Sequence, residues 1–133
     1  MKAIQMHKSL KLIDIIMRIG YLVIYFGAGI WALIFVDHYA NNMTISFIEA
    51  QGRGELQVLG AAYFVSATVL LYQWIKGQEA NLYINPAAVL TATLLSRLVS
   101  ILKGDVNQML ITLILFEVVF AAWAFWFLAR RNA

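Results

Sequence analysis

Two ionisable side chains lie inside long apolar stretches of this 133-residue chain: Arg97 in "TLLSRLVSILKG" and Glu117 in "ILFEVVF". An arginine at the centre of a membrane-spanning helix costs about 2.5–3.5 kcal/mol, so a compensating partner is expected. Arg97 precedes the short turn "KGD" and Glu117 follows it. On two antiparallel helices that leave this turn, the depths of the two backbones in the membrane differ by roughly 6–9 Å at about 1.5 Å per residue. The spacing therefore predicts an Arg97–Glu117 ion pair.

A second group of polar residues opens the second apolar segment, in "GRGELQVLGAAYF". Its glycines would let the backbone bend, and a helix N-terminus there would offer free N–H groups. We expect this group to join Arg97 and Glu117 in a polar pocket that opens outward. Its members are Arg53, Glu55, Gln57 and Tyr63. The alternative is an Arg97–Glu117 pair that only locks two helices together.

The composition indicates the elements that must position these residues. The chain is 62% hydrophobic and 13% charged, whereas soluble domains carry about 45–50% apolar and about 25% charged residues. Four unbroken apolar runs are each long enough to cross a bilayer as a helix. They lie at about 19–36, 55–74, 86–102 and 106–128. We predict an all-α, integral membrane antiparallel four-helix bundle in a single domain, 1–133, with Pro86 at the first position of the third helix.

The basic residues predict an orientation. With Arg97 set aside, seven lysines and arginines fall on the side of the two termini and the second loop, and two fall on the other side. The excess predicts cytoplasmic termini in a multi-pass protein of the cell's inner (plasma) membrane. The loop at 37–54 then faces outward.

Several kinds of chemistry find no support in the sequence. There is no cysteine, and the two histidines, His7 and His38, lie at opposite ends of the first apolar run. We expect no metal site and no cofactor. The basic residues gather at segment ends and no base-reading motif occurs, so we expect no nucleic-acid partner.

Two further features have structural interpretations. Small residues recur every four positions, which favours close helix packing inside the bundle, with a homodimer face as the alternative. They are Ala28 and Ala32 on the first helix, Ala62 and Ser66 on the second, and Ala88, Ala92, Ser96 and Ser100 on the third. Asp14 and Arg18 form an i, i+4 pair that we expect to be solvated at the membrane interface.

Three motifs together resemble a known group of sequences: "GRGELQVLGAAYF", "SRLVSILKGD" and the lone glutamate of "LFEVV". The chain from Ile19 to Arg131 resembles the small four-span bacterial membrane proteins of domain-of-unknown-function family 4345. The resemblance implies that Arg53, Gly54, Arg97, Gly104 and Glu117 match family positions. Ala61 follows Gly60 where the family pattern has a second glycine. The resemblance implies no particular biochemistry.

Three functions compete. The favoured one is a binding or accessory protein, which holds a lipid-like ligand in its outward pocket or docks against a membrane protein partner in the lipid bilayer. The second is a proton- or cation-coupled transporter that acts as a homodimer, with Glu117 as the coupling carboxylate; pairing with Arg97 would keep that carboxylate charged. The third is a membrane-embedded enzyme on a hydrophobic substrate, with Glu117 or Glu55 as proton shuttle and Arg97 binding an oxyanion. No catalytic residue is specified by the sequence.

Overall fold

The computed structural model describes residues 7–43, 45, 50–104 and 106–131, and these form helices joined by short turns. The elements are α1 (Lys8–Ile34), α2 (Val36–Asn42), α3 (Ala50–Ile75), the 3₁₀ turn η1 (Glu79–Asn81), α4 (Ile84–Leu102) and α5 (Gln108–Arg131). The four long helices are each long and apolar enough to cross a membrane. The expected all-helical architecture with four such helices is therefore confirmed.

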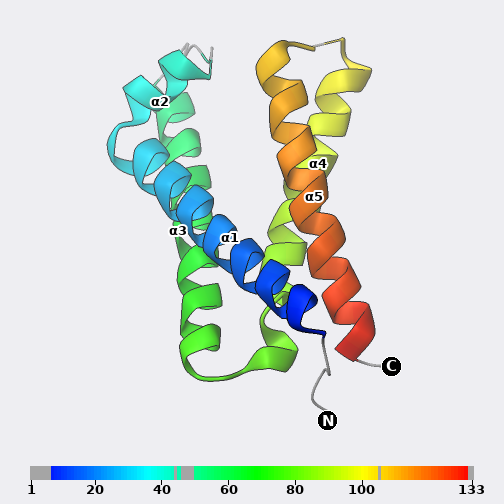
Figure 1. Ribbon diagram of the computed structural model, residues 1–133. Helices are drawn as coiled ribbons and strands as arrows, with labels where there is room; N and C mark the ends of the chain where they lie inside the picture. Colours follow the sequence, from blue (N-terminus) through cyan, green and yellow to red (C-terminus); the bar gives the residue numbers. More distant parts are fainter. Residues whose placement is uncertain (1–6, 44, 46–49, 105, 132–133) are drawn as a thin grey trace.

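The helices pair as two units, α1 with α3 and α4 with α5 (Figure 1). The start of α1, η1 and the end of α5 lie at one end of the molecule, which we call the terminal end. Helix α2 and the α4–α5 turn lie at the other end, which we call the loop end (Figure 1). The two pairs diverge towards the loop end in this view.

Local sequence explains where α4 and α5 meet. Gly104 has φ of +83°, a left-handed conformation that glycine adopts without steric cost, and its N–H donates to the Ile101 carbonyl at 3.0 Å. The Asn107 Oδ1 accepts a bond from the Leu110 N–H at 2.8 Å and so caps the start of α5. The predicted tight turn between the third and fourth spans follows from these contacts.

Several predicted boundaries were wrong. Helix α3 begins at Ala50, five residues before the expected start, and α2 occupies part of the expected outer loop. Pro86 is the third residue of α4, not the first. Proline is tolerated there because the first four N–H groups of a helix have no intrahelical acceptor.

Helices α1 and α3 cross with their backbones in close approach. A Cβ atom on Gly29 would lie 2.7 Å from the Phe64 backbone nitrogen, and one on Gly60 would lie 2.7 Å from the Leu33 backbone nitrogen. Ala32 and Ser66 are buried nearby on the same two helices. The predicted small-residue packing therefore holds for Ala32 and Ser66, with two glycines at the closest point of the crossing.

The same prediction was wrong for α4. Ala88, Ala92 and Ser96 are exposed, because α4 packs on its neighbours through another face that includes Ala87, Leu90 and Thr93. Ala62 on α3 is also exposed.

The outer surface of the bundle is aliphatic. Leu12, Ile16, Val23 and Ile34 on α1 are each 58–66% exposed. The interior instead contains a group of aromatic side chains, including Tyr21, Tyr25, Tyr63 and Phe127. Such an outward-facing apolar surface is typical of helices surrounded by lipid.

Candidate functional site

The predicted ion pair is present between α4 and α5. An Nη atom of Arg97 donates to the Glu117 Oε1 at 3.0 Å. The Glu117 side chain is 9% exposed and that of Arg97 is 25% exposed. Two antiparallel helices that leave the same turn bring these residues together across 20 positions of sequence. The pair neutralises both charges where water is largely excluded.

The pair is joined through a single contact, and this leaves hydrogen-bonding capacity unused. The Nε of Arg97 and the Oε2 of Glu117 are both buried, and neither has a hydrogen-bond partner. An arginine and a carboxylate can form two parallel bonds, and here one is formed. A buried polar atom without a partner costs about 1–3 kcal/mol. This ion pair therefore retains one buried donor and one buried acceptor that are free.

Three buried tyrosines from other helices interact electrostatically with these charges. Tyr25 on α1, Tyr39 on α2 and Tyr63 on α3 all lie within electrostatic reach of Arg97 and Glu117. The Tyr25 and Tyr63 rings pack edge to face at 5.1 Å. Burial raises the pKa of the Tyr39 phenol above its ordinary value; nearby Glu117 reinforces the rise and Arg97 opposes it. Aromatic side chains of α1, α2 and α3 therefore contribute to the electrostatic environment of the ion pair.

Two of the predicted pocket residues have other partners, and a third is exposed. Arg53 forms an exposed ion pair with Asp37 of α2 at 2.7 Å. Gln57 donates to the Leu33 carbonyl of α1 at 3.2 Å. Glu55 is exposed and lies within α3, not at a helix start that could offer free N–H groups. The site at Arg97 and Glu117 therefore includes Tyr63 from the predicted set but takes no contact from these three.

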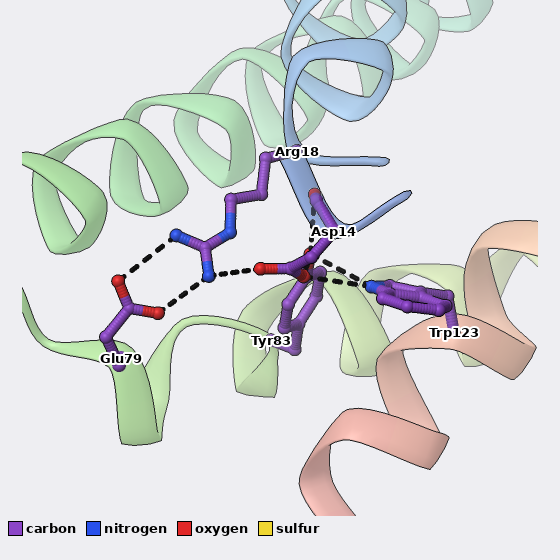
Figure 2. Close-up of polar contacts among 5 residues, drawn as sticks. All are labelled: Asp14, Arg18, Glu79, Tyr83 and Trp123. Atoms are coloured by element: carbon purple, nitrogen blue, oxygen red, sulfur yellow. Dashed lines mark hydrogen bonds and ion pairs between the residues drawn. The ribbon is translucent and has the colours of Figure 1, made fainter. Parts of the chain in front are cut away.

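A second polar cluster lies at the terminal end, and we call it the terminal network (Figure 2). Asp14 contacts an Nη of Arg18, and it accepts bonds from the Tyr83 hydroxyl at 2.5 Å and the Trp123 Nε1 at 3.0 Å. Arg18 also donates to both carboxylate oxygens of Glu79, at 3.2 and 2.6 Å. The network joins α1, the turn η1, α4 and α5.

The terminal network contradicts the expectation of a solvated Asp14–Arg18 pair. Asp14 is 2% exposed and Arg18 is 5% exposed. Their burial is compensated by partners far away in sequence, up to 109 residues for Trp123. The missed signal was the apolar context "LIDIIMRIGYL", in which two charges lie inside an apolar stretch as Arg97 does.

A third polar contact lies between the α1–α3 pair and the start of α4. The Tyr21 hydroxyl and the Ser66 hydroxyl are 2.7 Å apart, and Ser66 donates to the Asn85 Oδ1 at 2.5 Å. Ser66 is 1% exposed. This small residue therefore serves as a hydrogen-bond bridge as well as a packing position.

The described residues contain no group of three or more His, Asp or Glu side chains placed to hold a metal ion. His38 instead accepts a hydrogen bond from the Trp31 Nε1 at 2.7 Å.

Comparison with known proteins adds no relative: no protein-family model, no curated protein and no solved structure matches this chain.

Proposed function

We propose that this protein is an integral membrane binding protein that holds a small amphipathic molecule against Arg97 and Glu117, in the half of the bundle nearer the loop end. The observation that carries the proposal is the pair of unpartnered buried atoms, the Arg97 Nε and the Glu117 Oε2. A native ion pair rarely leaves a buried atom unpartnered on each of its two members unless something else binds them.

The two atoms define the chemistry of the ligand. The Arg97 Nε–H needs an acceptor, and the Glu117 Oε2 needs a donor. A hydroxyl or a primary amide supplies both from one small group. The surrounding tyrosine rings and aliphatic surface favour an apolar remainder. We therefore propose a lipid-like alcohol or amide as the ligand class.

A double substitution tests this proposal without exposing a lone charge. In Arg97→Met/Glu117→Met both charges are replaced by flexible apolar side chains, and such replacements of a buried pair are often neutral or stabilising. The matched control is Arg53→Met/Asp37→Met, which removes an exposed pair at the loop end.

The measurement is native mass spectrometry of protein extracted gently from its own membrane. We expect the wild type and the control to retain one small molecule, and the Arg97/Glu117 double variant to lose it. Equal retention by all three proteins would contradict the proposal. Circular dichroism and gel filtration establish that the variants are folded.

An accessory role in a larger membrane assembly is a second candidate. The exposed small residues Ala88, Ala92 and Ser96 on α4 favour it, because small side chains allow another helix to approach closely within a membrane. The same mass spectra test this role. Partner chains, or a second copy, that dissociate in Ala92→Leu but not in Val119→Leu on the exposed face of α5 would support it.

A further inference from the structure

The guanidinium of Arg18 is enclosed at the terminal end by two acidic side chains and an indole ring. Asp14 contacts one Nη atom, and Glu79 accepts from both Nη atoms (Figure 2). The guanidinium carbon lies 5.2 Å from the centre of the Trp74 ring. The Nε of Arg18 is buried and has no hydrogen-bond partner. One donor of a buried arginine is therefore free.

The two acidic partners differ in how firmly they are held. The Asp14 side chain is 3% exposed and is fixed by Tyr83 and Trp123. The Glu79 side chain is 56% exposed and projects from the short turn η1. An ion pair with one exposed partner contributes little net stability. Glu79 can therefore be displaced by another anion while Asp14 stays in place.

A second arginine approaches the same turn. An Nη of Arg131, in the last turn of α5, donates to the carbonyl of Ala80, the residue after Glu79. Arg18 and Arg131 thus converge on η1 from two different helices. The described residues near this end include six basic side chains and two acidic ones. The basic residues are Lys8, Lys11, Arg18, Lys76, Arg130 and Arg131, and the acidic ones are Asp14 and Glu79.

Tryptophan side chains lie against two of these arginines. Trp74 lies under Arg18, and Trp126 lies 4.9 Å from the Arg130 guanidinium. Tryptophans with neighbouring arginines are typical of the interface region of a membrane, where lipid phosphates lie.

We propose that Arg18 and Arg131 bind the phosphate group of an anionic phospholipid, and that Glu79 occupies this site in the lipid-free protein. Two non-bridging phosphate oxygens would replace the two carboxylate oxygens of Glu79 on the Arg18 fork, since arginine binds both groups in the same planar geometry. Asp14 neutralises part of the Arg18 charge, so selectivity depends on these directional bonds and on Arg131. The site lies in the other half of the bundle from Arg97 and Glu117 and is independent of the proposed function.

The first test removes the ion pair between Arg18 and Glu79 and keeps the rest of the terminal network. In Glu79→Gln the competing carboxylate is lost. Arg18 itself is not substituted, because it is buried. A matched control, Asn81→Lys, adds the same unit of positive charge to an exposed position of η1 without freeing Arg18. Binding of phosphatidylglycerol and of phosphatidylcholine to detergent-solubilised protein is measured by native mass spectrometry.

We expect Glu79→Gln to bind phosphatidylglycerol about fivefold more tightly than the wild type, the factor that corresponds to releasing one half-exposed ion pair. Asn81→Lys should change the affinity for phosphatidylglycerol less. The affinity for phosphatidylcholine should be the same in all of these proteins. Equal gains in Glu79→Gln and Asn81→Lys would show simple charge attraction and would overturn the proposal.

A second variant and a second probe complete the test. Arg131→Gln should lower the affinity for phosphatidylglycerol and leave stability in phosphatidylcholine unchanged; wild-type affinity in Arg131→Gln would overturn the proposal. Inorganic phosphate distinguishes the source of the group. If it displaces the lipid at equal concentration, the site accepts a free phosphate ion as well; if it does not, the lipid is the ligand.

Discussion

The close crossing of α1 and α3 predicts opposite effects for the same substitution at Gly27 and Gly29, two positions apart on α1. In Gly29→Ala the new methyl group would lie 2.7 Å from the Phe64 backbone nitrogen and 2.8 Å from the Gly60 carbonyl oxygen. Side-chain carbons essentially never approach so closely, and both neighbours are backbone atoms that cannot rotate away. The two helices must therefore separate by several tenths of an ångström.

The magnitude follows from two opposing terms. Overpacking of this kind costs about 1–3 kcal/mol, and replacing glycine by alanine inside a helix returns up to about 1 kcal/mol. At Gly27 a methyl group would meet nothing within 4 Å, so only the favourable term remains. Since the favourable term is common to both variants, we expect Gly29→Ala to be about 1–3 kcal/mol less stable than Gly27→Ala, which is the overpacking cost alone.

Unfolding by sodium dodecyl sulfate in mixed micelles, followed by circular dichroism, measures this difference in free energy. Both variants carry the same chemical change on one helix, so effects on helix propensity and on the unfolded state largely cancel. Equal stability of the two variants would refute the backbone contact between α1 and α3.

Three further outcomes are expected. Arg97→Met and Glu117→Met should each lose about 2 kcal/mol of unfolding free energy, less than the about 3–5 kcal/mol typical of a fully buried pair, because the Arg97 side chain is 25% exposed. In a double-mutant cycle the double variant should recover most of that stability, and additive losses would disprove the coupling. Asp14→Asn should lose about 3 kcal/mol, because it leaves a buried arginine without its main counter-charge, whereas Asp37→Asn, 60% exposed in its ion pair, should stay within about 0.5 kcal/mol in the same unfolding assay. Because the pKa of Tyr39 is raised in the folded state, its contribution to stability is complete below the ordinary phenol value of 10.0 and is lost as the pH rises through the folded-state pKa. In a pH series of unfolding curves, the wild type should therefore lose stability relative to Tyr39→Phe above pH 10.0 and not below it.

The four long helices and the Arg97–Glu117 contact could be predicted because both depend on local features. Unbroken apolar runs define the helices, and a short glycine turn fixes the register of α4 against α5. Once that register is set, the depths of Arg97 and Glu117 follow from the rise per residue. Only their side-chain reach remained to be seen.

The terminal network could not be predicted in the same way. Asp14 and Arg18 satisfy the local pattern of an exposed i, i+4 pair, and their additional partners lie 61 to 109 residues away. Which distant side chain reaches a given helix depends on how the two helix pairs pack, and no spacing rule contains that information. The polar residues that open α3 were misplaced for a related reason: α2 brings Asp37 to Arg53, and the sequence pattern of that segment suggested an irregular loop.

The terminal network also has a consequence for biogenesis. Asp14 is synthesised 109 residues before Trp123, its last partner. At about 5–20 residues per second that interval lasts roughly 5–20 s. At first the Asp14–Arg18 salt bridge alone shields the two charges; Glu79 and Tyr83 come next, and the network closes only when Trp123 of the last helix arrives. The final helix therefore completes the assembly, because a chain truncated before α5 leaves the Asp14 carboxylate without its Trp123 partner.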